Sequence, residues 1–185
     1  MQEPLIVLGI SRSGTSLVSG IFCLHGAFFG QCREADNNNP KGYFENKKIS
    51  DIKRQTRSRH LFGRKEIHNI LIEDGYPGGL WGVKFLPDSI NMWDNFNPTF
   101  ICCRRGLEQN YKSYSRFFST SKPKFTSYYR KMHKVMDKVS SFDIKTKDVI
   151  KGDYLSLKEA INSVGLIFDE DLTNSFIEKD YWHFD

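Results

Sequence analysis

The chain has 185 residues, of which 39% are apolar and 14% aromatic, enough for one folded domain spanning 1–185 and too many for a disordered chain. Lys and Arg number 27 against 22 Asp and Glu, so a net charge of +5 favours anionic ligands without requiring a nucleic acid. The four cysteines form no CxxC pair. Their placement argues against a zinc site or a disulfide framework, and it indicates a reducing compartment.

The N-terminal region carries no sign of a targeting or membrane segment. Residues 1–4 lack the positive charge that begins a signal peptide. Residues 13–32 have no formal charge, but half of them are small or polar, which favours a buried helix beside a loop over a membrane span. We therefore expect a soluble, cytoplasmic protein with no membrane span.

The first expected element is a strand at Leu5–Leu8, a continuous apolar run between Pro4 and Gly9. A loop follows, and a helix begins near Ser16. Four apolar residues of this helix share one stripe, which we expect to face the core: Leu17, Ile21, Leu24 and Phe28.

Turn-forming residues dominate 31–43, which we expect to be a loop. A polar helix is expected over 45–59, and residues 60–80 favour no element. In the second half of the chain, buried strands are expected at 80–85 and 99–103, with a short strand at 148–151. The remaining expected elements are helices, at 89–96, 107–119, 128–139 and 157–164.

Strands and helices that alternate in this way predict a parallel sheet covered by helices. The expected fold class is α/β, a three-layer P-loop-like fold. Its sheet should hold about four to five strands and carry helices on both faces.

The loop after the first strand carries the chemistry. In Gly9–Ser16 the glycine spacing is that of the P-loop pattern GxxxxGK[ST], with Thr15 in the lysine position. Glycines let the backbone curl, so that successive N–H groups and the helix N-terminus can bind an anion. Arg12 adds a cation inside the loop. The hydroxyl groups of Ser11, Ser13, Thr15 and Ser16 add further donors.

The missing lysine separates this loop from that of an ATPase, which uses the lysine on the β- and γ-phosphates and the next hydroxyl on Mg²⁺. No apolar strand ending in Asp resembles a Walker B motif. The loop therefore favours a phosphate-type group and chemistry without a bound metal. A Mg²⁺-dependent P-loop phosphotransferase, such as a small kinase, remains the alternative enzyme.

Two segments together resemble a known family. Ser11–Ser16 (SRSGTS) is similar to the 5′-phosphosulfate loop of sulfotransferases that use 3′-phosphoadenosine 5′-phosphosulfate (PAPS). Phe100–Arg105, with Ser113 eight residues after Arg105, is similar to that family's 3′-phosphate motif, a strand ending in Arg with Ser on the next helix. The order of both motifs along the chain is that of the family.

Three shorter segments extend the resemblance. Asn39–Glu45 resembles the NPKGxxE segment of bacterial members, Trp81–Lys84 resembles their tryptophan-containing strand, and Asp153–Leu155 resembles a late acidic-x-Leu turn. Two differences stand out: Phe85 follows Lys84 where the family has Asp-Pro, and Gly106 follows the arginine of the 3′-phosphate motif.

The resemblance implies transfer of a sulfuryl group from PAPS to an acceptor hydroxyl or amine, with no metal. It implies that Ser11–Ser16, with Arg12 as a catalytic residue, hold the 5′-phosphosulfate. Arg105 and Ser113 would hold the 3′-phosphate, with Arg104 as the competing arginine. Lys84 could touch the sulfonate or the acceptor, or face solvent.

The family uses Glu or His as the base that takes the acceptor's proton. Glu45 is the first candidate, because its segment should fold back over the crevice; as a structural alternative it stabilises a helix N-terminus. Glu34 and His60 are the other candidates. The acceptor itself stays open: a carbohydrate, lipid, peptide or small molecule.

A non-catalytic protein is the remaining alternative, either a degenerate nucleotide-binding member of the fold or a nucleic-acid binder. Residues 115–134 mix cations with aromatic residues, which suits phosphate contacts and base stacking, but a solvated helix face is the commoner explanation, and the periodicity of 128–139 supports it. We therefore do not expect nucleic acid as a partner. A second group of cations supports the same alternative: Lys47, Lys48, Lys53, Arg54, Arg57, Arg59, Arg64 and Lys65.

Overall fold

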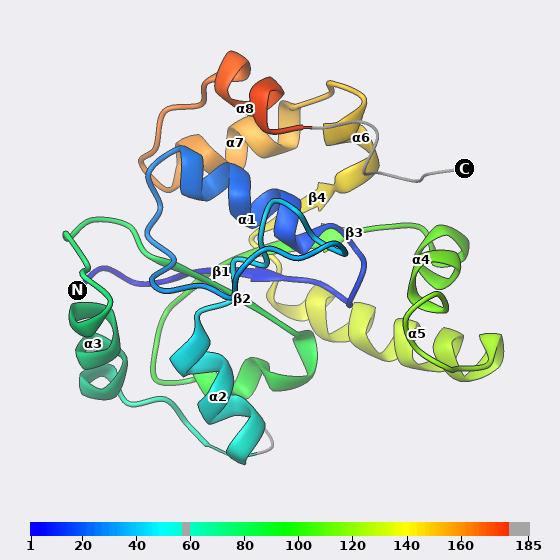
Figure 1. Cartoon of the computed structure of the whole chain (residues 1–185), viewed down its shortest axis with the longest axis horizontal. Coiled ribbons are helices and arrows are strands. Elements are labelled where there is room, and N and C mark those ends of the chain that lie inside the picture. Colours follow the sequence, from blue (N-terminus) through cyan, green and yellow to red (C-terminus); the bar gives the residue numbers. More distant parts are fainter. Residues whose placement is uncertain (57–59, 178–185) are drawn as a thin grey trace.

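The computed structural model describes residues 1–56 and 60–177, and within them all strands form one parallel sheet (Figure 1). The strand order is β2-β1-β3-β4. The strands are β1 (Leu5–Leu8), β2 (Gly82–Phe85), β3 (Thr99–Arg104) and β4 (Phe142–Lys145). The predicted α/β class is confirmed, with four strands in the sheet.

Position in the sheet explains the composition of each strand. β1 pairs in parallel with β2 on one side and β3 on the other, and its four residues are all buried. A strand covered on both faces needs an apolar residue at every position, as Leu5–Leu8 has. β4 is an edge strand, and among its residues only Ile144 is buried, so its sequence alternates.

One face of the sheet is covered by the helices that follow β1 and β4. They are α1 (Thr15–Leu24), α6 (Thr146–Ile150) and α7 (Leu155–Ser163), with α8 (Glu170–Phe176) packed on α1. Val7 and Ile101 of the sheet, Ile21 of α1 and Leu157 of α7 belong to one buried apolar cluster. This cluster is the core of the upper layer in Figure 1.

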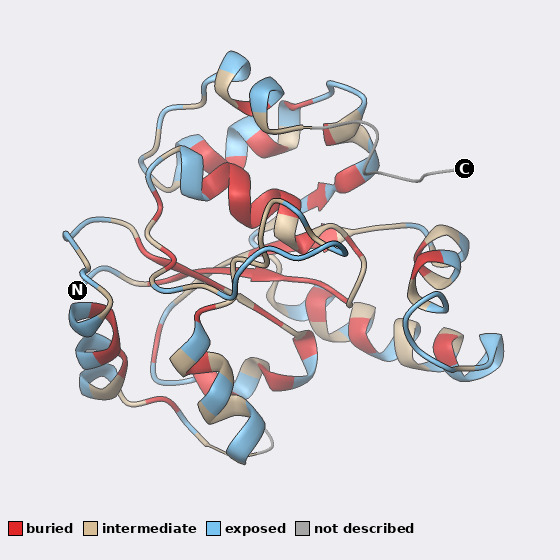
Figure 2. Cartoon of the chain, viewed as in Figure 1, coloured by how far each residue is buried: buried red, intermediate tan, exposed pale blue. Residues whose placement is uncertain are grey.

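The opposite face carries α2 (Lys47–Thr56), α3 (Arg64–Glu73), the 3₁₀ helix η1 (Pro87–Trp93) and α5 (Lys122–Val139). Ile6 and Leu8 of β1 point to this side, where they join a second cluster that includes Trp93 and Met136. The buried residues of the helices in Figure 2 face the sheet from both sides, so the molecule has three layers. No described helix is both long and apolar enough to span a bilayer.

The strand predicted at 148–151 is wrong. Residues 148–150 belong to helix α6, Lys151 follows its last residue, and the fourth strand is formed by Phe142–Lys145. An edge strand buries one side chain in two, so the Phe-Asp-Ile-Lys run gave a weak signal, whereas the apolar Val149 and Ile150 suggested a strand. Residues 60–80, for which no element was predicted, contain α3.

Several helix boundaries also differ from the predictions. α1 ends at Leu24, which is 42% exposed, and Phe28 lies beyond the helix, in a bridge to Trp81, so the predicted stripe holds only for Leu17 and Ile21. The helix predicted over 45–59 spans Lys47–Thr56, and residues 57–59 lie outside the described part of the chain.

The connections create a crevice at the carboxyl ends of the strands. After β1 the chain continues to α1, which covers one face of the sheet. After β3 it continues through α4 (Leu107–Tyr114) to α5, which covers the other face. Neighbouring strands whose connections run to opposite faces leave a crevice between them, which is where ligands bind in open α/β sheets.

Candidate functional site

The loop between β1 and α1 is tightly curled. Arg12 and Gly14 both adopt a positive φ, 69° and 91°. A Cβ atom added to Gly9 would lie 2.4 Å from the Ser13 hydroxyl and 2.5 Å from a Thr15 methyl group, because the chain turns back over this glycine. The loop therefore has the curled form that the glycine spacing predicts.

Three side chains from outside the loop hold its carbonyl groups. Asn110 donates to the carbonyl of Ser11 at 3.3 Å, and Arg105 donates to that of Arg12 at 2.8 Å. Thr146 donates to the carbonyl of Ser13 at 3.0 Å. In a trans peptide the next N–H points the opposite way, so these bonds turn the N–H groups of Arg12, Ser13 and Gly14 away from the three donors, and that of Ser13 donates to the carbonyl of Ile10 at 3.0 Å.

The N-terminus of α1 completes the loop. Among the described residues, no protein group accepts a hydrogen bond from the N–H groups of Gly14, Thr15 and Ser16, all of which line a cavity. The first N–H of α1 that donates to a backbone carbonyl is that of Val18, which bonds to Gly14 at 3.2 Å. Unpaired N–H groups at a helix start carry partial positive charge and favour an anion.

Arg12 reaches from this loop toward α4. Its Nε donates to the hydroxyl of Ser113 at 3.3 Å, and its guanidinium lies 4.3 Å from the ring centre of Phe117. Within the described residues, no carboxylate lies within ion-pair distance of Arg12. Burial lowers the pKa of Arg12, and the nearby charge of Arg116 lowers it further.

Arg105 stands beside Arg12 in the same cavity. Burial lowers the pKa of Arg105 to about 10, with further contributions from the charges of Arg12 and Arg116. Two half-buried guanidinium groups whose pKa values are both lowered, mainly by burial, form a site where an anion would be stabilised.

Arg104, the competing arginine, points elsewhere. It forms ion pairs with Asp143 of β4 at 2.7 Å and with Asp137 of α5 at 2.9 Å, and it does not line the cavity. The structure thus brings Arg105, rather than Arg104, together with Arg12 and Ser113. Arg104 is the last residue of β3 and Arg105 the first residue after it, and their side chains contact different parts of the molecule.

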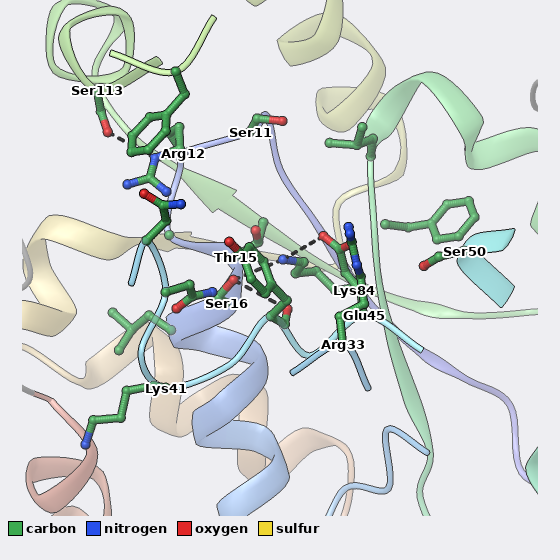
Figure 3. A pocket seen from close by; sticks show the side chains of 18 of the residues that line it. Ser11, Arg12, Thr15, Ser16, Arg33, Lys41, Glu45, Ser50, Lys84 and Ser113 are labelled. Carbon is green, nitrogen blue, oxygen red and sulfur yellow. Dashed lines mark hydrogen bonds and ion pairs between the residues drawn. The ribbon is translucent and has the colours of Figure 1, made fainter. Parts of the chain in front are cut away.

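The centre of the cavity holds a buried lysine (Figure 3). Lys84, at the end of β2, places its Nζ 3.0 Å from the hydroxyl of Ser16 and 2.9 Å from a carboxylate oxygen of Glu45. Its side chain is only 10% exposed, and burial lowers the pKa of Lys84. A neighbouring strand therefore supplies the ammonium group that the loop sequence lacks at Thr15.

Glu45 reaches the cavity because residues 31–47 form a folded-back loop. The two ends of this loop pair through their backbones. The N–H of Arg33 donates to the backbone carbonyl of Glu45, and the N–H of Lys47 donates to that of Gln31, both at 2.9 Å. At the tip, the Tyr43 hydroxyl donates to the carboxylate of Asp36 at 2.8 Å. The expected fold-back of this segment over the crevice is thus present.

The other candidate bases lie away from the cavity. Glu34 is 90% exposed and pairs with Lys47 at 3.5 Å, whereas His60 pairs with Glu66 at 2.8 Å. Ser13 does not line the cavity either, since its side chain is buried next to Gly9. The donor expected from the Ser13 hydroxyl is therefore not presented to a ligand.

Sequence reasoning missed Asn110, Thr146, Phe117 and Arg116. Asn110 had a signal, because it lies three residues before Ser113 on α4 and both polar side chains are buried on one helix face. Thr146 had none, since its role depends on β4 lying beside β3. No three His, Cys, Asp or Glu side chains in the described chain cluster as metal ligands.

The cavity measures about 780 Å³, within the usual range for small-molecule sites. Arg12 and Ser113 lie toward one end of it, Lys84 and Glu45 in the middle, and Ser50 of α2 at the other end (Figure 3). Fold and site together define a three-layer α/β protein with a basic, ligand-sized cavity at the carboxyl ends of its strands. No protein-family model matches the chain, and no curated protein matches it significantly.

Proposed function

We propose that the protein is a PAPS-dependent sulfotransferase. The observation that carries this proposal is the pair of half-buried guanidinium groups, Arg12 and Arg105, beside the Ser113 hydroxyl and the unpaired N–H groups of the curled loop. The resemblance assigns the loop and Arg12 to the 5′-phosphosulfate of PAPS and Arg105 with Ser113 to its 3′-phosphate. The chemistry of these groups supports such a ligand, because each can donate a hydrogen bond to an anion.

The residues would divide the work along the cavity. The loop N–H groups and Arg12 would hold the 5′-phosphosulfate, and Arg105 with Ser113 would hold the 3′-phosphate. PAPS supplies an activated sulfuryl group, whose bond to the phosphate oxygen breaks as a bond to the acceptor oxygen or nitrogen forms. Arg12 and Lys84 would stabilise the negative charge that grows on the phosphate side.

Glu45 is the base that the geometry supports. Its carboxylate lines the cavity and is held by Lys84 at 2.9 Å and Arg33 at 3.6 Å. The acceptor's proton would pass to a carboxylate oxygen of Glu45 as the acceptor oxygen forms its bond to sulfur. Neither Glu34 nor His60 lines the cavity.

The position of Lys84 also bears on the kinase alternative. In P-loop phosphotransferases the hydroxyl corresponding to Ser16 coordinates Mg²⁺. Here that hydroxyl accepts a hydrogen bond from the Lys84 ammonium at 3.0 Å, and a cation at this distance disfavours a divalent metal at the same oxygen. This contact supports sulfuryl transfer over Mg²⁺-dependent phosphoryl transfer.

A thermal-unfolding comparison tests the proposal. We expect 3′,5′-ADP without metal, at about 100 times its Kd, to stabilise the protein by about 2.7 kcal/mol, raising Tm by about 5 to 10 °C. ATP with Mg²⁺ should raise it far less. The opposite ranking would identify a phosphotransferase, and no shift with either nucleotide would refute nucleotide binding altogether.

A further inference from the structure

The charge of the cavity extends well beyond the donor residues. Eight of its described lining residues are Lys or Arg and two are Asp or Glu. Arg12, Arg105 and Arg116 lie at the end assigned to PAPS, and Lys84 lies in the middle. The cations on the opposite side come from the 31–47 loop and from α2, and PAPS does not account for them.

Three cations line the α2 side of the cavity, and two of them are only loosely neutralised. Arg33 approaches Glu45 at 3.6 Å and Lys53 approaches Asp88 at 3.4 Å, both longer than an ordinary N–H···O hydrogen bond. Arg54 forms a close ion pair with Asp51 of its own helix, but both side chains are more than half exposed, and an exposed pair of this kind is weak enough to be exchanged for a ligand. Glu45, the nearest carboxylate, is already bound more closely by Lys84 at 2.9 Å.

These cations stand where an acceptor would enter. In Figure 3, Lys84 and Glu45 lie between Arg12 on one side and Arg33 and Ser50 on the other. Lys53 and Arg54 follow Ser50 on α2 and also line the cavity. A neutral acceptor would replace the water on these cations with hydrogen bonds to uncharged oxygens, which are weaker than those to an anion. An acceptor with its own negative charge would replace them with charge-assisted bonds.

We infer that the α2 side of the cavity binds an anionic group of the acceptor, so the acceptor is a hydroxyl compound that carries a carboxylate, phosphate or sulfate. This inference rests on the proposed function. Lys53 and Arg54 bind the anionic group, and Glu45 faces the hydroxyl. The positive cavity also attracts such a substrate over its uncharged counterpart before contact.

The test uses the full chain saturated with 3′,5′-ADP, whose binding is measured first. Matched compounds are then titrated by calorimetry: glucuronate against its methyl ester, and glucose 6-phosphate and glucose 6-sulfate against glucose. We expect an anionic member to bind at least about fivefold more tightly than its neutral counterpart. The pair that shows the preference distinguishes a carboxylate from a phosphate or sulfate.

Two double variants locate the effect. Lys53→Gln with Arg54→Gln should reduce the preference to less than about twofold and leave 3′,5′-ADP affinity unchanged. Arg130→Gln with Lys131→Gln is the matched control, because it removes the same charges from an adjacent Arg-Lys pair on α5, outside this cavity. The control should retain the preference.

Equal affinity within every pair, including no measurable binding of any member, overturns the inference. A preference that survives the Lys53 and Arg54 substitutions overturns it as well. Both results are distinct from a chain that does not bind 3′,5′-ADP, which refutes the proposed function itself.

Discussion

The Lys84 ammonium at the end of β2 lies 3.0 Å from the Ser16 hydroxyl at the start of α1. Residues 68 positions apart thereby meet because β1 and β2 are neighbouring parallel strands whose carboxyl ends share one edge. The lysine missing from the loop sequence is replaced from the adjacent strand. Lys84 is largely buried, and within the described chain Glu45 is the only carboxylate close to it. A substitution of Lys84 therefore tests the centre of the cavity directly.

Replacing Lys84 with Met should lower sulfuryl transfer by about 10²- to 10³-fold, the usual effect of removing one preorganised donor to developing charge. Methionine keeps most of the buried volume, so the fold should survive. Because 3′,5′-ADP lacks the sulfuryl group, its affinity should change little. Turnover from PAPS and calorimetric titration of 3′,5′-ADP measure the two effects. A variant with unchanged turnover would remove Lys84 from the reaction.

Replacing Glu45 with Gln should lower the rate by about 10²- to 10⁴-fold, because the amide cannot accept the acceptor's proton. Turnover from PAPS is the measurement, and Glu34→Gln, whose side chain is exposed outside the cavity, is the control. Unchanged turnover for Glu45→Gln would leave the base unassigned.

The neighbouring arginines Arg104 and Arg105 should behave differently. Arg105→Gln should weaken 3′,5′-ADP binding by about 10- to 100-fold and AMP binding much less, because AMP lacks the 3′-phosphate. Arg104→Gln should leave both affinities unchanged and lower thermal stability, since it breaks the ion pairs to Asp143 and Asp137. If the Arg104 variant, and not the Arg105 variant, loses the preference for 3′,5′-ADP over AMP, then Arg104 is the arginine that binds the 3′-phosphate.

Local patterns predicted the parts of the site that one segment determines. The curled loop follows from Gly9 and Gly14, and the β1 strand from its apolar run. Contacts between distant segments were beyond reach: the Lys84–Ser16 bond depends on the order of β1 and β2, and the direction of Arg105 on the exact end of β3. The edge strand β4 escaped prediction for a different reason: only one of its four residues is buried, so its sequence carries a weak apolar signal.

The cysteines test the core independently of function. Cys102 and Cys103 lie in β3 and are buried, and burial raises the pKa of Cys102 to about 11 and that of Cys103 well above its ordinary value. A raised pKa leaves little thiolate at pH 8, so neither should react with iodoacetamide in the native protein. Cys32, whose pKa burial raises to about 12, should also react slowly.

Burial also raises the pKa of Cys23, but Cys23 is the only one of the four that is exposed, so mass spectrometry of the native protein should find label mainly there. After unfolding in denaturant, all four thiols should react. Fast native labelling of Cys102 or Cys103 would contradict the placement of β3 inside the sheet.

The curled loop makes its own prediction through Gly14. A Cβ atom there would lie 2.6 Å from a methyl group of Thr146, and the residue has a φ of 91°, which side chains disfavour. Gly14→Ala should therefore lower the free energy of unfolding by about 2 kcal/mol or more, combining backbone strain with a steric clash. Gly152→Ala is the matched control, since Gly152 has a φ of 88° but no atom within 4 Å of an added Cβ, and it should cost about 1 kcal/mol. Urea unfolding monitored by circular dichroism measures both, and equal costs would mean that the loop does not pack against Thr146.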